Sequence, residues 1–177
     1  MSQSTDLRNW KNWVSLAARL ILGIVLIWSG AAKVGNLASS VTSTNAYQIL
    51  PYGAVQVVGN ALPFCEMGLG LLLVIGLFTR VMGALGALLM LGFIIAIASV
   101  WARGISIDCG CFGTGGPVDP AEATAAYPWE ILRDIGLMIC GGWLVFTKEK
   151  FIAVDAWLFR PIEEIVAAPA KTSRKKR

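Results

Sequence analysis

The hydrophobic residues of this chain are gathered in four blocks, separated by polar or turn-rich stretches. The clearest block is residues 81–102, a run of 22 residues without a charge between Arg80 and Arg103. At about 1.5 Å per residue such a helix is roughly 33 Å long, enough to cross a hydrocarbon core of about 30 Å. Because three similar blocks accompany it, the pattern predicts an all-α, polytopic membrane protein with a four-transmembrane-helix bundle.

The other three blocks span a membrane only if ionisable residues enter it. The uncharged part of each is 13 residues, or roughly 20 Å. We therefore extend each helix past a charge and predict four membrane helices, at about 13–34, 60–79, 81–102 and 128–147. Several ionisable side chains then lie within the membrane or at its rim: Arg19, Lys33, Glu66, Arg133 and Asp134.

Lysine and arginine are concentrated on one side of these helices. The arm 1–12 and the tail 148–177 are basic, and the short turn between the second and third helices carries Arg80. We expect the protein in the plasma membrane. Because Lys and Arg mark the cytoplasmic side, both termini are predicted to lie in the cytoplasm. The outer loops are then 35–59 and 103–127. The short turn also predicts that the two helices it joins pack as an antiparallel pair.

The first outer loop, residues 35–59, contains no charged residue. Its apolar and aromatic side chains favour an interfacial helix that lies on the bundle. Since proline disrupts a helix interior, we expect this helix to end at Pro51.

The composition agrees with a membrane protein and excludes some chemistries. The chain is 56% hydrophobic and 15% charged, against about 45–50% and about 25% in soluble domains. It contains no histidine, which argues against bis-histidine haem and against a triad with a histidine base. It also has no dinucleotide fingerprint. The expected partners are the lipid bilayer and an exported or membrane protein, and not nucleic acid.

Two of the four cysteines, Cys109 and Cys111, form a Cys-Gly-Cys sequence in the second outer loop. The extracytoplasmic side permits disulfides, and Gly110 allows the bend that so short a ring needs. A strained, exposed disulfide is oxidising and exchanges readily with other thiols. The pattern favours a redox pair, with a local structural bridge or two reduced thiols as the alternatives.

Metal binding is the competing interpretation of the same pair. Two thiolates suit soft ions such as Cu(I) or Hg(II), and also Zn(II). Zinc prefers four ligands, and only Cys65, Asp108 or Glu66 lie where they could complete the set of Cys109 and Cys111.

The ionisable residues of the outer half of the bundle form a second candidate group. Glu66 and Arg133 are predicted at similar depth, so we expect them to pair, with Lys33 nearby at the outer rim. A cation near the cysteine pair would stabilise a thiolate. Cys65 is a possible relay thiol, whereas Cys140 is interpreted as a small hydrophobic residue.

Several short motifs occur in an order that resembles a known family. They are Trp28-Ser29-Gly30-Ala31-Ala32-Lys33, Tyr47-Gln48-Ile49-Leu50-Pro51, Leu62-Pro63-Phe64-Cys65-Glu66, Gly76-Leu77-Phe78-Thr79-Arg80, Asp108-Cys109-Gly110-Cys111-Phe112-Gly113 and Arg133-Asp134. Over residues 13–147 the chain resembles the MauE-like branch of the DoxX superfamily of four-helix membrane proteins. The resemblance implies a role in disulfide formation or electron transfer during maturation of an exported enzyme. It also implies Cys109 and Cys111 as the redox pair, supported by Glu66, Arg133 and Lys33.

Three functions are therefore expected, in this order. The first is a membrane thiol–disulfide redox protein that passes electrons between exported partners and a membrane acceptor such as a quinone. The second is a soft-metal binder or transporter that uses the same thiols. The third is a non-catalytic subunit of a membrane complex.

Overall fold

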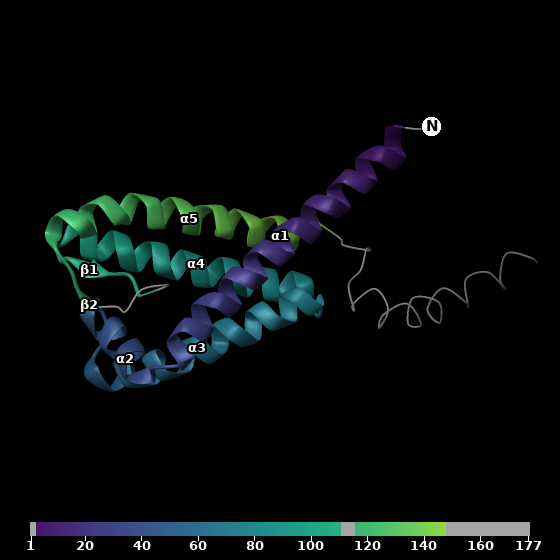
Figure 1. The fold of residues 1–177 in the computed structure, drawn as a ribbon. Coiled ribbons are helices and arrows are strands. Elements are labelled where there is room, and N and C mark those ends of the chain that lie inside the picture. Colours follow the sequence, from purple (N-terminus) through teal and green to yellow (C-terminus); the bar gives the residue numbers. More distant parts are fainter. Residues whose placement is uncertain (1–2, 111–115, 148–177) are drawn as a thin grey trace, which may run out of the picture.

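The structure, a computed structural model, describes residues 3–110 and 116–147, with side chains from Trp10 onward. Within these ranges, five helices and one short hairpin follow one another (Figure 1). They are α1 (Gln3–Val34), α2 (Leu37–Ala46), α3 (Tyr52–Ile75), α4 (Thr79–Ala102), β1 (Ile107–Asp108), β2 (Gly116–Pro117) and α5 (Pro120–Phe146). The prediction of a predominantly helical fold is confirmed.

Three helices are long and apolar enough to cross a membrane: α1 over Trp10–Val34, α3 and α4. The fourth predicted membrane helix is present as α5, but α5 does not meet the same apolar criterion. It carries the ionisable residues Glu122, Glu130, Arg133 and Asp134. Length and composition thus identify three spans within the described part of the chain.

Three predicted helix starts were wrong: the helix predicted from residue 13 begins at Gln3, and two others begin earlier than predicted, each beside a proline. The helix predicted from residue 60 begins at Tyr52, directly after Pro51, and the one predicted from 128 begins at Pro120. Proline fits the start of a helix because its missing N–H has no helical partner there. The carboxylate of Asp119 caps α5 by accepting a hydrogen bond of 2.9 Å from the backbone N–H of Ala121.

The helix predicted in the first outer loop is present as α2, but it ends at Ala46, five residues before Pro51. Pro51 therefore marks the start of α3 and not the end of α2. The first turn of α2 is fixed by Asn36, whose side chain accepts a hydrogen bond from the backbone N–H of Ser39 at 3.1 Å.

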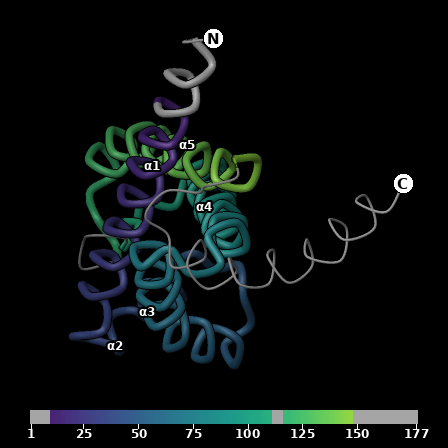
Figure 2. Tube along the Cα trace, turned by 90° about the vertical axis from the view of Figure 1, so that its right-hand side faces the viewer, coloured from purple at the N-terminus to yellow at the C-terminus, as the bar shows by residue number. Residues whose placement is uncertain are grey.

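The long helices pack as two pairs, α1 with α3 and α4 with α5. In both views α3 and α5 lie on opposite sides of the bundle (Figure 2). α3 and α4, which were predicted to pack as an antiparallel pair, are in contact, but each makes its most extensive contact with another helix. Gly23 of α1 faces Gly70 of α3, and an added Cβ on Gly70 would lie 2.6 Å from the carbonyl oxygen of Gly23.

The second pair has an equivalent contact between Gly83 of α4 and Gly141 of α5. An added Cβ on Gly141 would lie 2.7 Å from the carbonyl oxygen of Gly83. Small residues at such points let two membrane helices approach closely. The pairing of the long helices therefore follows the glycines and not the shortness of the turn.

The core is divided into two clusters. The larger lies between the long helices and includes Leu22, Leu26, Leu73 and Leu144. The smaller lies at the end that carries the hairpin, where Cys109 packs with Ile97, Val100, Ile107, Ala123 and Tyr127. The second cluster places Cys109 against residues of α4 and α5.

Candidate functional site

The segment that carries Cys109 begins with the hairpin strand β1. β1 pairs antiparallel with β2, with Ile107 opposite Pro117 and Asp108 opposite Gly116. Cys109 and Gly110 follow directly, and Gly110 has a φ of 67°, a conformation that favours glycine. The backbone N–H of Gly110 donates to the Asp108 carboxylate at 3.0 Å. Cys111 lies outside the described residues, so the predicted pairing of Cys109 with Cys111 stays a prediction.

Two tyrosines hold this segment in place. The Tyr127 hydroxyl accepts a hydrogen bond from the backbone N–H of Ile107 at 2.9 Å and donates to the carbonyl of Ile105 at 2.8 Å. The Tyr47 hydroxyl donates to the carbonyl of Cys109 at 2.8 Å. Arg103 in turn donates to the carbonyl of Tyr47. The backbone on both sides of Asp108 is thus anchored to α5 and to the end of α2.

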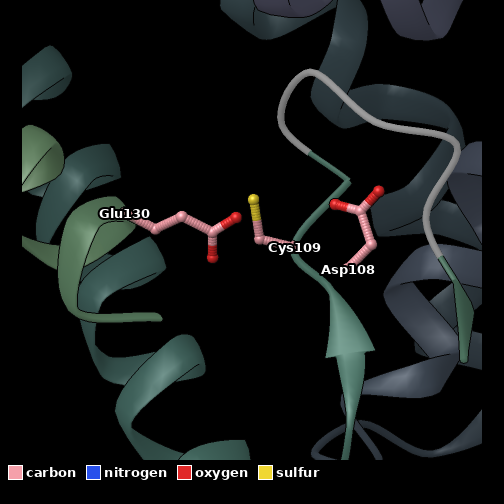
Figure 3. A group of neighbouring side chains, drawn as sticks. All are labelled: Asp108, Cys109 and Glu130. Carbon is pink, nitrogen blue, oxygen red and sulfur yellow. The ribbon is translucent and has the colours of Figure 1, made fainter. Parts of the chain in front are cut away.

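The side chain of Cys109 faces α5, where Glu130 reaches toward its sulfur (Figure 3). The Cys109 thiol and the Glu130 carboxylate are joined by a hydrogen bond. Cys109 is only 8% exposed, and Glu130 Oε2 is buried with no hydrogen-bond partner in the described part of the chain. This geometry gives the thiol a carboxylate that can take up its proton.

Donor atoms of Asp108, Cys109 and Glu130 all lie within 4.8 Å of one another. Such spacing is compatible with a shared metal ion. One sulfur with two carboxylates suits Zn(II) better than Cu(I) or Hg(II), which prefer several soft ligands. The two-thiolate site predicted from Cys109 and Cys111 includes a residue outside the described ranges and stays a prediction.

A buried ion pair lies between α1 and α3. Lys33 Nζ is 2.7 Å from Glu66 Oε1 and 3.0 Å from Glu66 Oε2. The Ser29 hydroxyl donates to Glu66 Oε2 at 3.2 Å, and Lys33 also lies 5.4 Å from the centroid of the Phe93 ring on α4. Glu66 has no exposed surface, so these contacts satisfy a carboxylate that is wholly inside the bundle.

A second ion pair lies on α5. Arg133 contacts Asp134 Oδ1 through Nε at 3.0 Å and through its NH2 nitrogen at 2.9 Å. Both residues line a cavity of about 10 Å³ together with Ser29, which is close to the room that one water molecule needs. Asp134 Oδ2 is buried without a hydrogen-bond partner among the described residues.

The predicted contact between Glu66 and Arg133 was wrong. Both residues lie near Ser29, which donates to Glu66 and lines the cavity beside Arg133. The helices α3 and α5 nevertheless lie on opposite sides of the bundle (Figure 2). Lys33 on α1, the helix that packs directly on α3, is therefore the cation that reaches Glu66. Arg133 is compensated by its own neighbour, Asp134.

The remaining cysteines are separated from this site. Cys65 is exposed on α3, and Cys140 is half-buried against the larger core cluster. No disulfide joins Cys65, Cys109 or Cys140 to one another. Cys109 packs against α4 and α5, whereas Cys65 lies on α3, so the described geometry does not bring the two together. Thiol–disulfide exchange between them stays a prediction.

Comparison with known families gives a match that covers most of the chain. The family described as methylamine utilisation protein MauE matches residues 11–147. The chain belongs to the MauE family. No curated protein matches it, and no solved structure does.

The MauE match includes both ion pairs and the whole Cys-Gly-Cys segment, and it leaves out the basic tail. Within it, sequence reasoning missed Glu130, Tyr47 and Tyr127. Glu130 stands three residues before Arg133, and such residues share a helix face. Recognition of Asp119-Pro120 as the start of α5 would have placed Glu130 well inside that helix, on the side of Arg133.

Proposed function

We propose that this MauE-family protein crosses the membrane four times and transfers electrons by thiol–disulfide exchange at Cys109 and Cys111 on the extracytoplasmic side. The observation that carries the proposal is the hydrogen bond between the thiol of Cys109 and Glu130 within a fixed segment. A carboxylate beside a buried thiol can accept the thiol proton and return it during the exchange.

The fourth span in this proposal is α5. It packs along α4, a helix that meets the length and composition criteria for a span (Figure 1). Its most buried charge, Asp134, is compensated by Arg133. Internal pairing reduces the free energy needed to bring ionisable residues into a bilayer, so the charges of α5 are compatible with a membrane position.

The orientation follows from the basic segments. With four spans, residues 1–12 and the tail 148–177 lie on the same side, and their Lys and Arg residues favour the cytoplasm. The end of the bundle that carries α2 and the hairpin is then extracytoplasmic (Figure 1). That side also permits the disulfide that the redox role requires.

The exchange proceeds in two steps. A thiolate of a reduced partner protein attacks Cys111, because the sulfur of Cys109 is nearly covered. The Cys109–Cys111 bond breaks, a mixed disulfide forms, and Cys109 leaves as a thiolate that takes up a proton. The second partner thiol then displaces Cys111, so the partner gains a disulfide while this chain gains two thiols and two electrons.

The supporting charges have structural roles in this proposal. Asp108 fixes the bend at Gly110 through its carboxylate. Lys33 and Glu66 join α1 to α3, while the charges of Arg133 and Asp134 act on Glu130. That Cys65 acts as a relay thiol remains a prediction, and a Cys65→Ser variant tests it.

A quinone was suggested as the electron acceptor. The cavity beside Arg133 and Asp134, at about 10 Å³, is far too small for a quinone ring. We therefore derive no step through a quinone, and the proposal is limited to exchange between protein thiols.

The test is oxidation of a reduced dithiol peptide by the full chain, purified in its oxidised form and reconstituted in phospholipid nanodiscs. The proposal predicts close to one peptide disulfide per chain in a single turnover, measured by mass spectrometry. Cys109→Ser and Cys111→Ser are expected to abolish the reaction, and Cys140→Ser to preserve it. No oxidation by the native chain would contradict the proposal.

The metal alternative is favoured by the spacing of Asp108, Cys109 and Glu130. It predicts about one bound metal ion per purified chain, lost in the Cys109→Ser variant, without peptide oxidation. A protein that neither oxidises the peptide nor contains metal would instead fit the non-catalytic subunit role.

A further inference from the structure

The carboxylate of Glu130 is hydrogen-bonded to the Cys109 thiol, and neither the cysteine motif nor the family match assigns Glu130 a role. Glu130 comes from α5, whereas Cys109 follows β1, so the contact depends on the fold and not on neighbouring sequence positions (Figure 3). Its other carboxylate oxygen, Oε2, is buried and without a hydrogen-bond partner in the described part of the chain.

The surroundings explain why a local proton acceptor is needed. Cys109 is 8% exposed and packs among Ile97, Val100 and Tyr127, so bulk water has little access to its sulfur. A thiol reacts in exchange only after it loses its proton. The groups whose charge acts on Glu130 are Asp108 on the same segment as Cys109, and Arg133 and Asp134 on α5. Arg133 is the one cation among them.

We propose that Glu130 is a catalytic residue of the thiol exchange, the group that takes the proton from Cys109 and returns it. This inference rests on the proposed redox function. When a mixed disulfide is present on Cys111, Glu130 accepts the proton of the Cys109 thiol. The Cys109 thiolate then attacks Cys111, the Cys109–Cys111 bond re-forms, and the partner leaves as a thiolate. In the opposite direction the Cys109 thiolate is released and takes its proton from Glu130. Two electrons move between the two proteins in each direction, and no other reactant is needed.

The experiment isolates the chemistry of Cys109. The full chain is prepared in nanodiscs with Cys65→Ser, Cys111→Ser and Cys140→Ser, so that Cys109 is the single remaining thiol. Its reaction with 4,4′-dithiodipyridine, a small neutral disulfide, is followed by the release of thiopyridone at pH 7. Because this protein cannot form a Cys109–Cys111 bond, the result does not depend on whether the native chain catalyses redox turnover.

Glu130→Gln keeps the size of the side chain and removes the proton acceptor. The expected result is a rate about 100-fold lower, at the lower end of what general bases contribute. Glu122→Gln is the matched control, because Glu122 is an exposed acidic residue in the first turn of the same helix. Its rate is expected to be unchanged.

An equal or faster reaction in Glu130→Gln would overturn the proposal, since loss of a negative charge alone favours the thiolate. Glu130→Ala with added formate provides a second measurement. A small carboxylate in the vacated space is expected to restore at least part of the rate, whereas formate should not change the Glu122→Ala control. Absence of restoration in a correctly folded Glu130→Ala protein would also overturn the proposal. If either variant fails to fold, Glu130→Asp decides, because a carboxylate withdrawn by one methylene should slow the reaction, and an unchanged rate contradicts the role.

Discussion

Lys33 on α1 and Glu66 on α3 form an ion pair of 2.7 Å in which the carboxylate has no exposed surface. Lys33 also lies over the Phe93 ring of α4, so one side chain connects three helices. Such a pair stabilises the bundle only while both partners are present, because either charge alone would be buried without compensation.

Removal of Lys33 is therefore predicted to be costly. Lys33→Met leaves Glu66 buried and unpaired, and we expect a loss of about 3–5 kcal/mol in the free energy of unfolding. The double variant Lys33→Met, Glu66→Gln is expected to recover part of this loss, since it removes both charges. Denaturant unfolding in detergent micelles measures both effects. Lys11→Met, at an exposed position, is the control, and a Lys33→Met protein as stable as this control would refute the structural role of the pair.

The two neighbouring glycines Gly141 and Gly142 are predicted to respond differently to alanine. A Cβ on Gly141 would lie 2.7 Å from the Gly83 carbonyl oxygen, whereas nothing lies within 4 Å of a Cβ on Gly142. Gly141→Ala must separate α4 from α5 and should reduce stability by about 1–3 kcal/mol. Gly142→Ala should leave stability unchanged or raise it by up to about 1 kcal/mol. Thermal unfolding in micelles separates the two outcomes, and equal melting temperatures would mean that the glycine contact is not tight.

Loss of the Tyr127 hydroxyl should loosen the segment that carries Cys109. Tyr127→Phe leaves the buried backbone N–H of Ile107 without its 2.9 Å acceptor, at an expected cost of about 1–3 kcal/mol. Hydrogen exchange of the Ile107 amide should become faster, and so should alkylation of Cys109. Tyr52→Phe, on a residue that is 70% exposed, is the matched control. Unchanged protection of Ile107 in Tyr127→Phe would show that the hairpin is held by other contacts.

The placement of Cys65 gives a prediction about the relay. Cys65 is exposed on α3, while Cys109 is buried against α4 and α5. The Cys65→Ser protein is therefore expected to oxidise the dithiol peptide at the native rate, and the same is expected of the Cys140→Ser protein. A large loss of turnover specific to Cys65→Ser would establish it as a relay thiol and would require a different route for the electrons.

Some of these features were predictable from the sequence. The charge-free run between Arg80 and Arg103 predicts α4 almost to the residue, because a span needs about 20 apolar residues and few other elements do. The glycines around Cys109 predict a turn. The start of α5 was misjudged because the uncharged run was extended only to the length of a membrane span, whereas the helix begins at Pro120 and contains Pro128 in its interior.

The partners of the buried charges were not predictable from depth alone. Lys33, Glu66, Arg133 and Asp134 all lie near Ser29, and their pairing depends on which helices are neighbours. That order is set by close contacts such as Gly23 with Gly70, which a single sequence does not distinguish from an open glycine such as Gly68. Glu130 was missed for a related reason, since its contact with Cys109 joins segments that only the fold brings together.

The central claim is that Cys109 and Cys111 form a working redox couple, and their oxidation state in intact cells tests it most directly. Cells are trapped in acid, and the free thiols are then modified with a maleimide that shifts the protein on a gel. The measurement uses the double variant Cys65→Ser, Cys140→Ser, in which Cys109 and Cys111 are the two remaining cysteines. The account predicts a mixture of oxidised and reduced protein whose ratio shifts when a thiol reductant or a thiol oxidant is added to the cells. A pair that stays fully oxidised under mild reductant would identify a structural bridge, and a fully reduced pair protected from maleimide would identify bound metal; either result would contradict the account.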